Sequence, residues 1–114
     1  MMRDVFQRAT DQVLISKATI ELASIQFAQG DKAGALASYQ RLVLLGKYED
    51  PAIRPLLREA ILRSVELFQS MGRWQDVIEN ADRYTSEFPS ADRIEEVRRI
   101  RAEAIVNLSM RAQS

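Results

Sequence analysis

The chain of 114 residues contains no cysteine and no histidine. These absences exclude disulfide bonds, thiol nucleophiles, histidine acid–base catalysis and the usual zinc ligands. A chain without thiols suits the cytoplasm and the periplasm equally, so the compartment stays open. No glycine-rich phosphate loop, nucleophile elbow or metal-ligand spacing is present, and the adjacent Glu95 and Glu96 point in different directions on a helix. We therefore expect a protein that is not an enzyme and that binds no cofactor and no metal.

The chain also lacks an excess of charge of either sign, and it lacks long hydrophobic runs. The chain has 16 basic and 16 acidic residues, and nucleic-acid binding needs clustered cations, so no nucleic-acid partner is expected. The longest apolar run covers residues 42–45, far less than a membrane span, so no membrane insertion is expected. The first residues carry charges without an apolar core segment, so we expect no secretory signal peptide.

Two of the four glycines, Gly30 and Gly72, each separate two apolar-patterned segments. Glycine adopts the left-handed conformation that ends many helices, and Asp31 is well placed to cap the helix that follows Gly30. Each glycine therefore predicts the turn of a helical hairpin. Apolar spacing predicts helices over residues 10–29, 32–45, 55–71, 74–88 and 91–110.

Several helix boundaries depend on single residues. The segment before Thr10 either extends the first helix or frays. Asp50 is the expected cap of a short irregular or 3₁₀ lead-in before Pro55. Ser90 is the expected cap of the last helix.

The first expected helix carries two apolar stripes at helical spacing. Two stripes predict burial on two sides, as for a helix that lies between neighbours. One stripe consists of Leu14, Ala18, Leu22 and Ile25, and the other of Val13, Ile20 and Phe27. The second helix is rich in small residues, and Ala35 is its expected point of close approach to the first.

Small, aromatic and proline residues stand at several positions near the turn glycines, which lie 42 residues apart. Ala35 and Tyr39 follow the first turn, while Phe68 precedes the second turn and Pro89 closes that unit. In these positions the chain resembles the tetratricopeptide repeat family, whose period is 34 residues. The extra residues fall in the loop near residues 46–54.

The resemblance implies a single all-α domain over residues 1–114. Its antiparallel helical hairpins would stack as a right-handed superhelix of about five helices. Repeat one would span residues 14–46, repeat two residues 55–89, and a terminal capping helix residues 90–110. The loops after Gly46 and Phe88 are similar to those of bacterial envelope tetratricopeptide proteins, such as coordinators of cell-division and outer-membrane machinery.

The family resemblance also implies a function. The first helices of tetratricopeptide repeats line a groove that binds a peptide or a partner protein. Carried over by position, the partner-binding residues are Lys17, Ile20, Ser24, Phe27, Glu59, Leu62, Arg63, Glu66 and Gln69. Lys17 and Arg63 would suit a carboxylate, whereas the glutamates favour a basic or mixed peptide. The same residues also fit an ordinary solvated helix face.

Self-association is the alternative function. The chain holds two and a half repeats, whereas about three or more are normally needed, so the end helices could stack on another copy or on further repeats of a larger protein. Exposed Phe27 and Leu62 would indicate a ligand groove. Exposure at the end helices would indicate stacking, and the residues concerned are Val13, Leu14, Ala102 and Val106.

Overall fold

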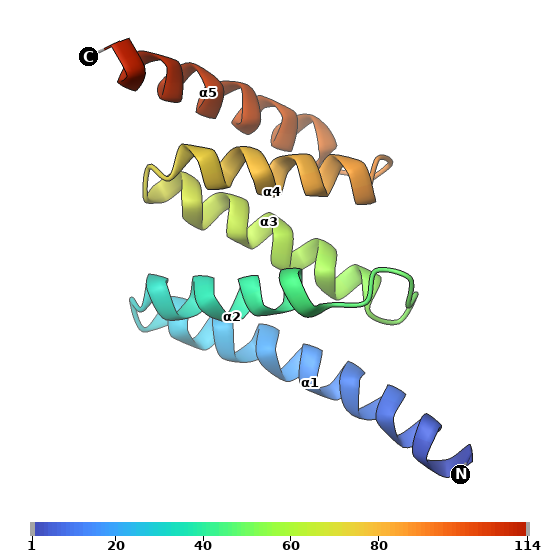
Figure 1. The fold of residues 1–114 in the computed structure, drawn as a ribbon. Coiled ribbons are helices and arrows are strands. Elements are labelled where there is room, and N and C mark those ends of the chain that lie inside the picture. The colour runs from blue at the N-terminus through green and yellow to red at the C-terminus, as the bar shows by residue number, and fades with distance from the viewer. Residues whose placement is uncertain (1, 114) are drawn as a thin grey trace. The chain divides into compact units, whose positions relative to one another are not determined.

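The computed structural model describes the backbone of residues 2–113 and the side chains of residues 11–112. Within these residues it is all-α, with five helices and no sheet (Figure 1). The helices are α1 (Met2–Ala28), α2 (Lys32–Leu45), α3 (Arg54–Ser70), α4 (Trp74–Glu87) and α5 (Ile94–Gln113). The expected all-α class is confirmed, and the right-handed superhelix stays a prediction.

The chain divides into two compact units, residues 1–60 (unit 1) and 61–114 (unit 2). Unit 1 contains α1, α2, the loop that follows and the start of α3. In unit 1, α1 packs against α2 as an antiparallel hairpin (Figure 1). Unit 2 contains the rest of α3 together with α4 and α5, and α4 packs against α5.

Gly30 and Gly72 both have the left-handed backbone expected of them, with φ of 83° and 69°. A Cβ atom at either position would meet no atom within 4 Å, so the backbone conformation alone requires glycine. The amide of the following residue donates to a carbonyl five residues earlier, from Asp31 to Gln26 at 2.9 Å and from Arg73 to Phe68 at 3.0 Å. This hydrogen bond is typical of a glycine-terminated helix, so both predicted turns are confirmed.

The two turns differ in how the next helix begins. The Asp31 carboxylate accepts a hydrogen bond from the Gly34 amide at 2.8 Å and caps α2, as expected. Arg73 holds the same position before α4 but makes no side-chain cap. Its guanidinium instead lies 4.9 Å from the centre of the Phe68 ring and pairs with Asp76 at 2.9 Å. The second turn is therefore stabilised by side-chain contacts across it.

The helix boundaries agree with the sequence in part. α1 begins at Met2, so the segment before Thr10 continues the helix. The Asp50 carboxylate accepts from the Ala52 amide at 2.9 Å, which makes Asp50 the cap of the lead-in to α3. The expected start of α5 at Ala91 with a Ser90 cap is wrong. The Ala91 amide bonds to the Phe88 carbonyl at 3.1 Å in a turn, and α5 begins only at Ile94.

Small side chains are buried in both units. In unit 1, Ala23 of α1 and Ala35 of α2 are both fully buried, and α1 packs against α2. The close approach of the two helices at Ala35 stays a prediction. Ser38 of α2 donates to the Gln26 side chain of α1 at 2.7 Å and adds a polar tie to the same hairpin. In unit 2, Ala81 of α4 is likewise fully buried.

Candidate functional site

An exposed apolar surface of α1 lies opposite its packed side. Ser16 and Ala23 are buried, whereas Leu14, Leu22 and Ile25 are 60%, 51% and 48% exposed. The expectation that α1 is buried on two sides is therefore wrong for its described part. Apolar periodicity shows which faces of a helix can be covered, but it does not show whether a partner is present. We call the solvent-facing set the outer stripe, and it consists of Leu14, Ala18, Leu22 and Ile25.

Lys17 and Glu21 run along one edge of the outer stripe. Both side chains are exposed, and neither makes an ion pair within the described part of the chain. They are four residues apart with the lysine first, which is the weaker order for an intrahelical pair. The two opposite charges are therefore available to groups outside the chain.

The expected partner-binding residues of unit 1 lie mainly at the surface. Lys17, Ser24 and Phe27 are exposed, and Ile20 and Glu59 are half-buried. Phe27 is 53% exposed, which is high for a phenylalanine. These residues are accessible as the family resemblance implies, although accessibility alone does not assign them a ligand.

In unit 2 the expected residues are less accessible. Leu62 is only 5% exposed and belongs to the core. Arg63 is exposed but donates to Glu66 at 3.0 Å, so this guanidinium already has a carboxylate within its own helix. Gln69 is half-buried. The exposure expected of Leu62 in a ligand groove is not found.

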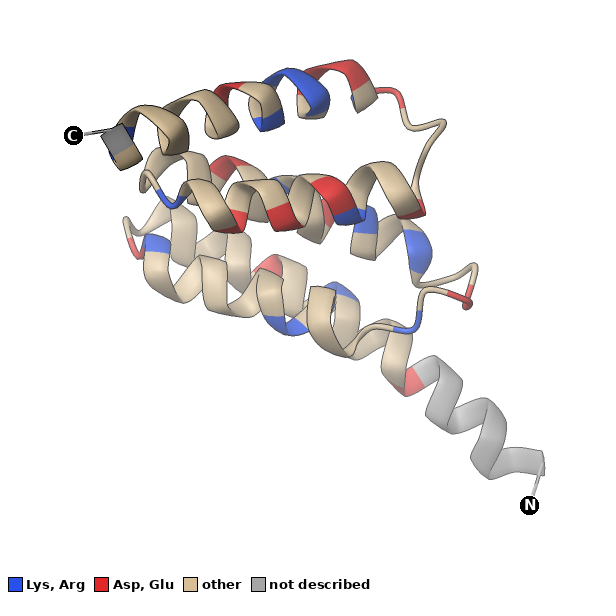
Figure 2. Cartoon of the chain, turned by 45° about the horizontal axis from the view of Figure 1, so that its top comes forward, with Lys and Arg blue, Asp and Glu red and all other residues tan. Residues whose placement is uncertain are grey.

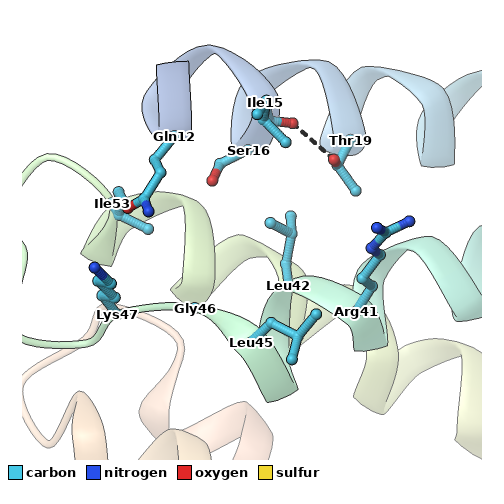
Figure 3. A pocket seen from close by; sticks show the side chains of 10 residues that line it. All are labelled: Gln12, Ile15, Ser16, Thr19, Arg41, Leu42, Leu45, Gly46, Lys47 and Ile53. Atoms are coloured by element: carbon cyan, nitrogen blue, oxygen red, sulfur yellow. Dashed lines mark hydrogen bonds between the residues drawn. The ribbon is translucent and has the colours of Figure 1, made fainter. Parts of the chain in front are cut away.

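A pocket of about 230 Å³ lies within unit 1, between α1, α2 and the loop after α2 (Figure 3). Ile15 of α1 and Leu45 of α2 face each other across it, with Arg41 near one end and Lys47 near the other. Sequence reasoning missed this site. The available signal was the apolar run at residues 42–45 with one basic residue before it and another shortly after it.

Charges concentrate on α4 and α5, whereas α1 and α2 show few in their described parts (Figure 2). The Arg93 guanidinium donates twice to the Glu96 carboxylate, each time at 2.8 Å. These hydrogen bonds raise the pKa of Arg93 and lower the pKa of Glu96. Arg101 of α5 donates to Asp82 of α4 at 2.6 Å. The charged residues of α5 and of the turn before it thus form pairs that support the helix and its packing on α4.

The C-terminal half of α5 carries a smaller exposed apolar area. Val106 and Met110 are 57% and 63% exposed, and Ala102 is exposed beside them. Together with Leu14 of α1, these residues place apolar surface on both terminal helices. Of the four residues whose exposure would indicate stacking, Leu14, Ala102 and Val106 are exposed, whereas Val13 is half-buried.

The described residues contain no group of three or more acidic side chains placed to hold a metal ion. None of their helices combines the length and the apolar character needed to cross a membrane.

Comparisons with protein-family models, with curated proteins and with solved structures find no match to this chain. The tetratricopeptide relationship therefore stays a prediction from the turn glycines and the residues around them. The functional argument depends on the exposed surfaces and the pocket described above.

Proposed function

We propose that this chain is a non-catalytic protein–protein interaction module of the tetratricopeptide type, which associates through α1. The observation that carries the proposal is the outer stripe. Leu14, Leu22 and Ile25 are each about half exposed on one side of a helix whose other side is packed. Soluble monomers rarely expose large contiguous apolar patches, and such patches often mark interaction sites.

A second copy of the chain is the partner that fits the outer stripe best. If two α1 helices pair antiparallel, Leu14 of one lies opposite Ile25 of the other, and Ala18 lies opposite Leu22. The small Ala18 of each helix then meets the large Leu22 of the other, and Leu14 meets Ile25, so the apolar side chains of the two stripes face each other. The same arrangement places Lys17 of each helix opposite Glu21 of the other, so two symmetric ion pairs form.

The outer stripe is small for an interface. Stable complexes bury about 800 Å² on each partner, and a single helix face of four residues supplies less. We therefore expect weak, concentration-dependent dimers. The oligomeric state must therefore be measured up to millimolar chain concentration.

A second candidate is peptide binding by the first-helix residues of unit 1. The exposure of Phe27, together with that of Lys17 and Ser24, supports it. Phe27 is not part of the outer stripe, so the two candidates can be separated by mutation. Phe27→Ala would weaken peptide capture and leave self-association unchanged.

Sedimentation equilibrium from micromolar to millimolar concentration tests the self-association proposal. The wild-type chain should shift from monomer to dimer mass, and Leu22→Glu should stay monomeric because it places a charge in the outer stripe. Leu44→Glu is the matched control, since Leu44 is 66% exposed on α2 and outside the stripe. A monomeric wild-type chain throughout this range, or equal dimerisation of both variants, would contradict the proposal.

A further inference from the structure

The pocket of unit 1 combines apolar walls with basic ends. Ile15, Leu42, Leu45 and Ile53 supply aliphatic surface, and Arg41 and Lys47 supply the charges (Figure 3). Neither cation has an ion-pair partner among the described residues, and no acidic side chain lies among the described residues that line the pocket. The pocket therefore favours a ligand that is apolar in the middle and anionic at its ends.

Ser16 adds a hydroxyl group to the lining of the pocket. It lies in the packed side of α1 and is only 7% exposed, yet its hydroxyl makes no hydrogen bond to any residue that the structure describes. The side chain points into the pocket (Figure 3). No fully buried side-chain oxygen or nitrogen among the described residues lacks a partner, so the Ser16 oxygen keeps contact with solvent on the pocket side. It is therefore free to hydrogen-bond to a ligand in the pocket. The neighbouring Thr19 hydroxyl, by contrast, donates to the Ile15 carbonyl at 2.7 Å.

We propose that this pocket binds an acidic peptide segment, with one aliphatic side chain between α1 and α2 and flanking carboxylates at Arg41 and Lys47. The Ser16 hydroxyl donates to a backbone carbonyl of the bound segment. The inference deepens the proposed interaction function by naming a partner chemistry, and it uses a surface separate from the outer stripe.

The spacing of the two cations suggests the form of the segment. Arg41 lies four residues before the end of α2 at Leu45, and Lys47 lies two residues beyond that end. Four steps at a helical rise of about 1.5 Å and two extended steps of about 3.3 Å place their Cα atoms at most about 13 Å apart. In an extended peptide every second side chain points the same way, at about 3.3 Å per residue. An acidic, an aliphatic and an acidic residue in alternate positions span about 13 Å on one face, and the long side chains of arginine and lysine can adjust to this length.

The probe is the peptide acetyl-Asp-Ser-Leu-Ser-Glu-amide, titrated into the ¹⁵N-labelled chain and followed by NMR. The Leu22→Glu variant serves as the starting protein, so that self-association does not enter the measurement. We expect saturable shifts at the amides of Ser16, Gly46 and Lys47. Replacing both peptide carboxylates by amides should weaken binding about two- to fivefold for each charge removed, as is typical of exposed ion pairs.

Two pairs of protein variants locate the site. Leu45→Glu should weaken binding about tenfold or more, because it places a like charge beside the peptide carboxylates. Leu44→Glu, at the neighbouring exposed leucine outside the pocket, should bind as the starting protein does. Lys47→Gln should weaken binding, whereas Lys32→Gln, which removes an exposed charge outside the pocket, should not. Thermal unfolding of each variant confirms that it is folded.

The result separates this inference from the self-association proposal. Absence of saturable shifts up to millimolar peptide, equal binding of the amide peptide, or equal effects of Leu45→Glu and Leu44→Glu would each overturn the peptide site. None of these outcomes changes the sedimentation result. Conversely, if the wild-type chain stays monomeric and binds the peptide as described, the self-association proposal is contradicted and the peptide site is supported.

Discussion

The side chain of Leu57 lies directly against the backbone of Gly46. A Cβ atom at Gly46 would overlap both Cδ atoms of Leu57 and would lie 2.6 Å from the Leu42 carbonyl oxygen. Leu57 is fully buried, and the Leu42 carbonyl already accepts the Gly46 amide at 2.8 Å, so neither neighbour is free to move. The Gly46 φ of −71° is ordinary, so glycine is required here for space.

Gly46→Ala should lower the free energy of unfolding by about 1–3 kcal/mol through overpacking. Urea denaturation followed by circular dichroism measures the change. Lys47→Ala, at the exposed next residue, is the control and should stay within about 0.5 kcal/mol of the wild type. Equal midpoints for Gly46→Ala and the wild type would show that the start of α3 does not pack on this loop as described.

The left-handed turns make a different prediction. Gly30→Ala and Gly72→Ala should each cost about 1–2 kcal/mol, because φ is positive at both positions and L-residues are strained there. Gly30→Asn should cost less than Gly30→Ala, since asparagine tolerates this conformation better. Both comparisons use the same urea titration, and an unchanged stability of the alanine variants would contradict the turn assignment.

Close approach of α1 and α2 at Ala35 can be tested by adding volume. Ala35→Leu should destabilise the chain by about 1–3 kcal/mol, because Ala35 is fully buried at the hairpin. Ala37→Leu adds the same volume two residues along, at an exposed position of α2, and should stay within about 0.5 kcal/mol. If the two variants unfold at the same urea concentration, the assigned hairpin packing is wrong.

The Arg93–Glu96 pair predicts a pH dependence of stability. The hydrogen bonds from Arg93 hold the pKa of Glu96 below its ordinary value of 4.5, so folding is favoured while Glu96 is ionised. This contribution is present above pH 4.5 and disappears as the pH falls through the lowered pKa. The stability difference between wild type and Glu96→Gln should therefore shrink as the pH is lowered from neutral into this acidic range.

The matched background for that experiment is Arg93→Gln. In this background Glu96→Gln should show a much smaller change with pH, because the donor that lowers the pKa is absent. Chemical denaturation at several pH values measures all four variants. If the pH dependence is unchanged in the Arg93→Gln background, it arises from another titrating group and not from the Arg93–Glu96 pair.

Much of the fold follows from local chemistry that the sequence displays. Gly30, Gly72, Asp31 and Asp50 act as predicted because each role depends on the residue itself and a few neighbours. The sequence predicts too early a start for α5, because Ser90 is a good cap by type. Whether a cap is used depends on where the preceding turn ends, and the bond from Ala91 to Phe88 extends that turn.

The candidate sites were harder to predict. Leu62 was expected at a surface because its position matches a groove residue of a family, but its burial is decided by tertiary packing. The outer stripe was recognised as apolar, yet periodicity gave no sign that it faces solvent. The pocket depends on residues from α1, α2 and the following loop meeting in space, which no single stretch of sequence reveals.

Cysteine cross-linking tests the antiparallel pairing of α1 most directly, because the chain has no cysteine of its own. Lys17→Cys and Glu21→Cys chains are mixed and oxidised, with Lys32→Cys as the control outside the outer stripe. The account predicts that the mixture forms covalent dimers faster than any of the three chains alone. If covalent dimers form no faster in the mixture than in the Lys32→Cys chain alone, the antiparallel pairing of α1 is contradicted.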